Sequence, residues 1–169
     1  LPPRLHEIAV LVTGRHWTSQ FEWWAHARLA KEAGIRDAVI DAIRERREPE
    51  FEDAKQAVVY RVAKTLLDQR GQLPDALFTE AQKTLGERGL VDVVATVGYY
   101  CFVSLTLNTF EVPVPGDHGI RGPDGRQVVG DHLGRGALRG HDEVEGDVVV
   151  VRAMAGDDVV EPVTLTVGA

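Results

Sequence analysis

The sequence predicts an all-α domain followed by an extension of a different kind. All eleven aromatic residues lie between Trp17 and Phe110, whereas residues 116–169 contain none of them and hold eleven of the seventeen glycines. The net charge is −2 over residues 1–115 and −5 over residues 116–169. Apolar residues recur at helical spacing in the first part. We therefore expect one helical domain over 1–115 and a Gly-rich extension over 116–169, either β or irregular. Without aromatic residues and with a net charge of −5, the extension is not expected to form a core of its own.

Three helices account for the first part of the domain. Pro2-Pro3 suits a helix start, because proline is tolerated in the first turn. Residues 6–15 are apolar on nearly all sides, as in a buried helix. Thr18-Ser19 opens a second helix, and Gly34 lies where a glycine would end it. A short third helix covers about 37–46.

Three longer helices are expected up to the prolines near residue 115. The fourth runs over 49–70 and ends at Gly71. The fifth covers 74–85 and stops near Gly86. The sixth covers 89–108, and this segment is too long for a strand despite its β-branched valines.

The extension contains strand and turn patterns. Residues 148–151 and 159–167 are rich in valine and predict strands, the second interrupted by Pro162. The pattern Gly-Asp-His-x-x-Arg-Gly occurs at 116–122 and again at 130–136. Its Asp and His residues match no metal-site spacing, so no metal is expected there.

The composition excludes several classes of partner. A net charge of −7 and no uninterrupted basic cluster argue against nucleic acid, which requires a basic face. No uncharged apolar run approaches the roughly 20 residues of a membrane span. Cys101 is the only cysteine, and the first residues lack a signal-peptide pattern, so a cytoplasmic location without disulfides is expected.

Three ionisable residues on apolar helix faces are the candidate catalytic groups. Glu22 and His26 are four residues apart, and the next positions on that face are apolar. Glu7 has the same setting on the first helix. Such groups are costly to bury unless they pair or face a cavity. If the first two helices form an antiparallel hairpin, Glu7 approaches His26, and the three groups make an acid–base site near neutral pH.

Each of these residues also has a purely structural interpretation. Ser19-x-x-Glu22 is a capping-box pattern, His26 alone fits a satisfied core histidine, and Glu7 alone fits a first-turn acid favoured by the helix dipole. Aromatic residues that could wall a substrate pocket could equally fill the core; we assign substrate binding to Trp17, Trp23 and Tyr99.

Several separated blocks of residues 1–115 resemble the carboxymuconolactone decarboxylase family, which has the alkylhydroperoxidase D-like fold. The blocks are Leu-Pro-Pro-Arg-Leu-His-Glu and the apolar run after it, then Glu-Trp-Trp-Ala-His at 22–26, then Gly-Tyr-Tyr at 98–100 through Asn-Thr-Phe-Glu-Val-Pro at 108–113. The resemblance implies an all-helical, homo-oligomeric protein, often a trimer or hexamer. It also implies that residues before the Leu-Pro-Pro motif help to build the pocket, and it does not cover 116–169.

The resemblance implies two activities. One branch decarboxylates a lactone acid without a cofactor. In this chain His26 would move the proton, Glu22 would orient or charge His26, and Glu7 would relay the proton or hold the substrate. The other branch reduces peroxides with a Cys-x-x-Cys pair, whose positions fall here at Ser19 and Glu22. Without those thiols, we expect the decarboxylase chemistry on a small carboxylated lactone or polyketide-like ring. The alternatives are a peroxidase-type oxidoreductase and a non-catalytic oligomeric scaffold.

Overall fold

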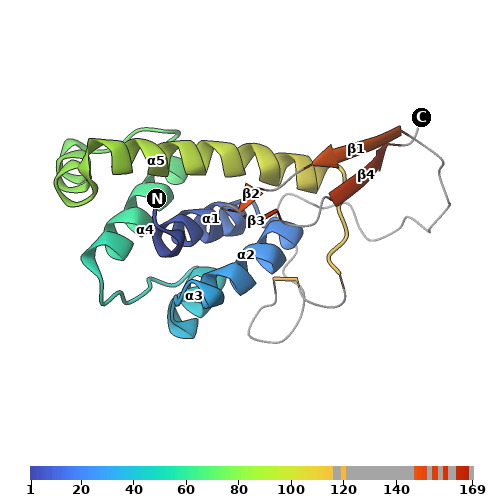
Figure 1. Ribbon diagram of the computed structural model, residues 1–169. Helices are drawn as coiled ribbons and strands as arrows, with labels where there is room; N and C mark the ends of the chain where they lie inside the picture. The colour runs from blue at the N-terminus through green and yellow to red at the C-terminus, as the bar shows by residue number, and fades with distance from the viewer. Residues whose placement is uncertain (116–118, 121–146, 152–153, 156–157, 160–162, 168–169) are drawn as a thin grey trace.

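The computed structural model describes residues 1–115, 119–120, 147–151, 154–155, 158–159 and 163–167 (Figure 1). Residues 1–115 are helical with short connections, and no strand occurs within them, which confirms the predicted all-α domain. The helices are α1 (Pro3–His16), α2 (Gln20–Glu32), α3 (Asp37–Arg44), α4 (Ala54–Asp68) and α5 (Asp75–Thr109).

Helix α1 occupies the centre of the domain. It packs against α2, α4 and α5, and it lies between α5 and the α2–α3 pair in Figure 1. Ile8, Ala9 and Val10 are fully buried on successive sides of the helix. This placement is the one predicted for a helix that is apolar on nearly all sides.

Helix α4 begins later than predicted. The expected start at residue 49 is wrong, because the helix starts at Ala54. The Asp53 carboxylate accepts hydrogen bonds from the backbone N–H groups of Lys55 at 2.7 Å and Gln56 at 3.3 Å. A side chain that satisfies these free N–H groups fixes the helix start at this residue.

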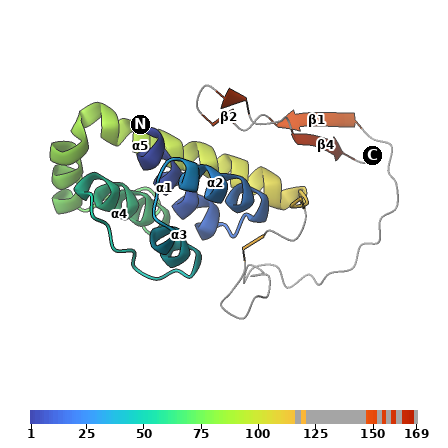
Figure 2. The same cartoon turned by 60° about the horizontal axis from the view of Figure 1, so that its bottom comes forward.

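Helix α5 consists of two helical segments joined at Gly86. This glycine has φ of 75° and ψ of 166°, which is a non-helical conformation in the left-handed half of the φ range. The predicted break near Gly86 is therefore confirmed, and Figure 2 shows the first turns of α5 angled away from the long remainder. Helix α5 is also long and apolar enough to cross a membrane, but core helices of soluble proteins pass the same test.

The described parts of the extension form two antiparallel strand pairs. Strand β1 (Asp147–Val151) pairs with β4 (Val163–Val167), with Val149 opposite Leu165. Strand β2 (Met154–Ala155) pairs with β3 (Asp158–Val159). The predicted strand at 148–151 coincides with β1, and the predicted strand at 159–167 divides into the end of β3 and β4. The repeated Gly-Asp-His pattern lies outside the described residues.

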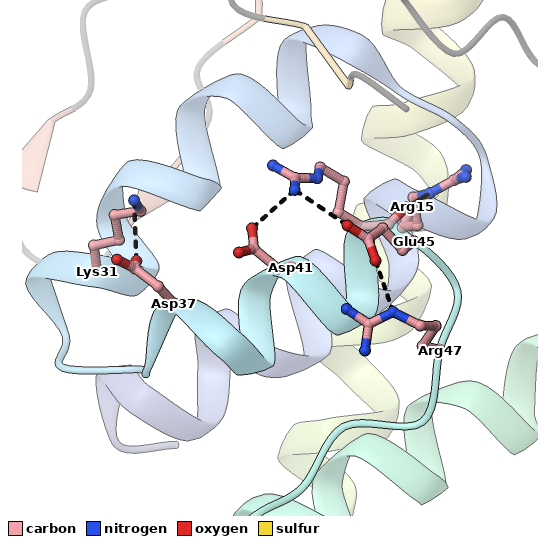
Figure 3. A network of polar contacts seen from close by, with 7 residues as sticks. Arg15, Lys31, Asp37, Asp41, Glu45 and Arg47 are labelled. Atoms are coloured by element: carbon pink, nitrogen blue, oxygen red, sulfur yellow. Dashed lines mark hydrogen bonds and ion pairs between the residues drawn. The ribbon is translucent and has the colours of Figure 1, made fainter. Parts of the chain in front are cut away.

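A network of charged side chains holds the end of α3 (Figure 3). Arg44 pairs with Asp41 at 3.1 Å and with Glu45 at 3.4 Å, and Arg47 donates to Glu45 at 2.6 Å. Arg15, from the last turn of α1, donates from Nε to the backbone carbonyl of Arg44 at 2.6 Å. The network thereby ties the C-terminal ends of α1 and α3 together.

Candidate active site

Glu7 and His26 form a buried pair between α1 and α2. The Glu7 Oε2 and His26 Nδ1 atoms are 2.9 Å apart, and the two residues are only 4% and 2% exposed. The contact arises because α2 packs against α1, as the conditional prediction of this contact assumed. A carboxylate at Nδ1 fixes the orientation of the ring.

Glu22 does not pair with His26, although both lie on one face of α2. These two described residues share no hydrogen bond, and Ser104 of α5 instead donates to Glu22 Oε2 at 2.6 Å. Glu7, and not Glu22, therefore orients His26, which corrects the predicted assignment. The spacing of four residues correctly places Glu22 and His26 on the same helix face. The hydrogen-bond partner of Glu22 is nevertheless Ser104, which is 82 residues away in sequence.

The capping-box interpretation of Glu22 is also wrong. Ser19 is the N-cap of α2, but its side chain makes no capping hydrogen bond, and its buried Oγ has no partner in the described structure. Glu22 Oε1 is likewise buried and without a hydrogen-bond partner there. It faces Gly14 of α1, where a Cβ atom would lie 3.3 Å from Oε1. The absent side chain at Gly14 leaves room for the carboxyl group.

Burial gives Glu22 an unusual titration. Removal from water raises the pKa of this carboxyl group from 4.5 to about 8, and the hydrogen bond from Ser104 opposes the rise. Glu22 is therefore mostly protonated at pH 7. A neutral carboxylic acid with one unpartnered oxygen can donate a hydrogen bond or a proton.

Tyr100 and His6 complete the cluster. Tyr100 was among the aromatic residues that could wall a pocket but was not assigned to the site, and His6 was not predicted. The Tyr100 ring meets the His26 ring edge-on at 4.9 Å and the His6 ring at 5.6 Å. Burial, with the nearby Glu7 and Glu22, raises the pKa of Tyr100. Burial lowers the pKa of His6, whose Nε2 atom has no hydrogen-bond partner in the described structure. The position of His6 directly before Glu7 was the available signal.

The three predicted substrate-binding aromatics differ in their surroundings. Trp23 is buried in the main hydrophobic core. Trp17 donates from Nε1 to the sulfur of Cys101 at 3.3 Å. Tyr99 is exposed, and its ring packs edge-on against Tyr100 at 5.2 Å. Of the three, only Tyr99 is linked through ring contacts to His26.

Cys101 has the character of a structural thiol. It is half-buried, and burial raises its pKa, which lowers the fraction of reactive thiolate. The chain has no second cysteine to resolve a disulfide. Among the described residues, no group of His, Cys, Asp and Glu is arranged to hold a metal ion.

A cavity of about 330 Å³ lies on the opposite side of α1 from Glu7. The C-terminal ends of α1, α3 and α4 meet there, where cations are favoured by the helix dipoles. None of Glu7, Glu22 and His26 lines this cavity. Its walls are formed by Val12, Arg15, His16, Ile43, Arg46, Tyr60, Lys64, Leu67 and Asp68.

Comparison of the chain with models of known protein families, with curated proteins and with solved structures gives no match.

Proposed function

We propose that the chain is a decarboxylase-type enzyme, a cofactor-independent acid–base catalyst acting on a small carboxylated lactone or polyketide-like ring. Its helical bundle would then be alkylhydroperoxidase D-like, and it would act as a homo-oligomer. The observation that carries the proposal is the buried Glu7–His26 pair, 2.9 Å apart, beside a carboxyl group whose pKa is about 8. Burying ionisable groups costs stability, and such clusters with shifted pKa values favour catalysis over a structural role.

In the proposed reaction His26 and Glu7 have different roles. Loss of CO2 breaks a carbon–carbon bond and leaves its electron pair on the substrate, delocalised into an enolate. The protonated His26 ring transfers a proton to that carbon, and Glu7 stabilises the charged ring before the transfer. Water returns the proton to His26, so the net change is a carboxylate plus a proton giving CO2 and a new carbon–hydrogen bond.

Glu22 has a different task in this proposal. Because it is neutral at pH 7, its Oε1 side can donate a hydrogen bond to the developing enolate oxygen. Ser104 holds the other oxygen of the carboxyl group and so fixes the direction in which the acid points. Tyr99 and Tyr100 form a chain of ring contacts from the surface to His26. We propose that a planar substrate approaches along these rings.

The peroxidase alternative has weaker support. A thiol peroxidase needs a thiolate nucleophile and a resolving thiol. Ser19 and Glu22 occupy the positions where the resemblance would place the cysteines, and the raised pKa of Cys101 opposes thiolate formation.

The test is turnover of a panel of small carboxylated lactones, followed by release of CO2. We expect the wild type to convert at least one of them and His26→Ala to lose about 10²- to 10⁴-fold, the usual contribution of a positioned acid or base. His16→Ala is the matched control, because this histidine lies on the cavity side of α1. Absence of CO2 from every lactone, or equal rates for wild type and His26→Ala, contradicts the proposal and favours a non-catalytic scaffold.

A further inference from the structure

The outer face of α5 carries an apolar stripe that nothing in the described chain covers. The apolar stripe consists of Val91, Val94, Gly98, Phe102 and Leu105, which recur at intervals of three or four residues and so share one helix face. All are exposed, and Phe102 reaches 64%. Contiguous exposed apolar surface of this kind marks an interaction site.

The spacing of the apolar stripe is symmetric about Gly98. Val94 and Phe102 lie four residues before and after it, and Val91 and Leu105 lie seven residues before and after it. A two-fold axis at Gly98 with antiparallel helices would therefore set Val94 against Phe102 of the second copy. It would likewise set Val91 against Leu105 of the second copy. A symmetric interface of this type brings one surface patch onto itself.

Among the described residues, nothing around Gly98 requires a glycine. A Cβ atom built at this position meets nothing within 4 Å, and the residue is exposed in mid-helix. Glycine destabilises a helix interior relative to alanine. Its missing side chain is useful where another backbone approaches closely, and the centre of a helix crossing is such a place.

Charge supports the same arrangement. From residue 89 to residue 110 the only charged residue is Asp92, which pairs with the N-terminal ammonium group at 3.3 Å. Arg88 precedes this uncharged stretch and Glu111 follows it. In the antiparallel arrangement, Arg88 of one copy lies within about one helical turn of Glu111 of the other. Opposite charges at the two ends favour this orientation over a parallel one.

We propose that a second copy of this chain docks on the apolar stripe, antiparallel to the first and with the two-fold axis at Gly98. The inner face of the same turns carries Tyr100 and Ser104, which contact His26 and Glu22. Dimerisation would therefore fix the position of α5, the helix that packs Tyr100 and Ser104 against the acid–base cluster. The proposal concerns assembly and does not depend on the reaction.

The first experiment measures mass in solution for the full chain by light scattering. We expect an even number of copies, and at least a two-fold drop in that number for Phe102→Glu. Phe78→Glu is the matched control, since Phe78 is 47% exposed on α5 but precedes the break at Gly86. A monomeric wild type, or an assembly that Phe102→Glu leaves unchanged, overturns the proposal. Retention of a monomeric wild type on phosphatidylcholine vesicles would instead identify lipid as the occupant.

The second experiment fixes the register by disulfide cross-linking in a Cys101→Ser background. Gly98→Cys should give a covalent dimer on oxidation, because the two positions meet at the axis. Val91→Cys alone should not, because two such residues lie about 21 Å apart along antiparallel helices. The double variant Val91→Cys with Leu105→Cys should cross-link. Efficient cross-linking by Val91→Cys alone, or none by Gly98→Cys, overturns the register even if Phe102→Glu fails to fold.

Discussion

The two sides of α1 differ in where their ionisable side chains lie: one side buries them, and the other places them around a cavity. On the Glu7 side, two carboxyl groups and two histidines are packed beneath α2 and α5 around Tyr100. On the Arg15 side, cations surround a cavity of about 330 Å³ at three helix ends. The buried ionisable groups lie on the filled side, where removal from water raises the pKa of Glu22. The cavity and the buried ionisable cluster therefore lie on different sides of this helix.

The largest expected effect that separates the two sides is the pH dependence of stability. The folded pKa of Glu22 is about 8, against 4.5 for the exposed group, so folding takes up a proton between these values. The contribution of protonated Glu22 to the free energy of unfolding is complete below pH 4.5. It is lost as the pH rises to about 8, by up to about 1.4 kcal/mol per pH unit. Glu22→Gln should remove this slope from urea unfolding curves, whereas Glu32→Gln on the exposed part of α2 should keep it. An identical slope in the Glu22→Gln protein would show that another group is responsible.

The next comparison sets the buried ion pair against an exposed one. Glu7→Gln keeps the shape of the side chain but replaces a charge-assisted bond to His26 with a neutral one, and should lower the free energy of unfolding by about 1–3 kcal/mol. Asp68 pairs with Lys64 at 2.7 Å beside the cavity, with both side chains about half exposed. Asp68→Asn should cost less than about 1 kcal/mol. Equal losses for the two variants would mean that burial does not distinguish the two sides of α1.

A third variant tests the link between Glu22 and α5. Ser104→Ala removes the donor to Glu22 Oε2 and leaves both carboxyl oxygens without a partner, so stability should fall by about 1–2 kcal/mol. Because the hydrogen bond lowers the pKa of Glu22, its loss should move the titration midpoint above 8. Ser104→Thr retains the hydroxyl group and serves as the control. A midpoint that falls in Ser104→Ala would refute the hydrogen-bond account.

The smallest expected effect concerns Cys101. Cys101→Ser retains an acceptor for the Trp17 indole N–H, so its unfolding free energy should change by less than about 1 kcal/mol. Peroxide consumption with a dithiol reductant should be no greater in the wild type than in this variant. Cysteine-dependent consumption in the wild type would revive the peroxidase alternative.

Local signals in the sequence predicted most of the helical framework. The break at Gly86 follows from glycine's freedom to adopt a positive φ, and α1 was predicted to be buried from its apolar residues alone. The start of α4 was predicted too early, because a proline at residue 49 resembles a first-turn residue, whereas the Asp53 cap sets the start. Boundaries depend on side-chain hydrogen bonds that composition does not specify.

The site was predictable only where local packing determined it. Glu7 and His26 belong to consecutive helices of one hairpin, so their contact followed from a single assumption about packing. The partner of Glu22 comes from Ser104, and the ring beside His26 comes from Tyr100, both on the distant α5. Spacing along α2 carries no information about which residues of α5 face it.

Direct titration of the Glu22 carboxyl group tests the central claim, a proton donor buried against α1 and α5. The carboxyl carbon of Glu22 can be followed by ¹³C NMR across the pH range, with Glu22→Gln to identify its signal. The structure predicts a midpoint at about 8, with the group still protonated at pH 7. A midpoint near the ordinary value of 4.5 would show that Glu22 is ionised at neutral pH, and would contradict its role as the neutral acid.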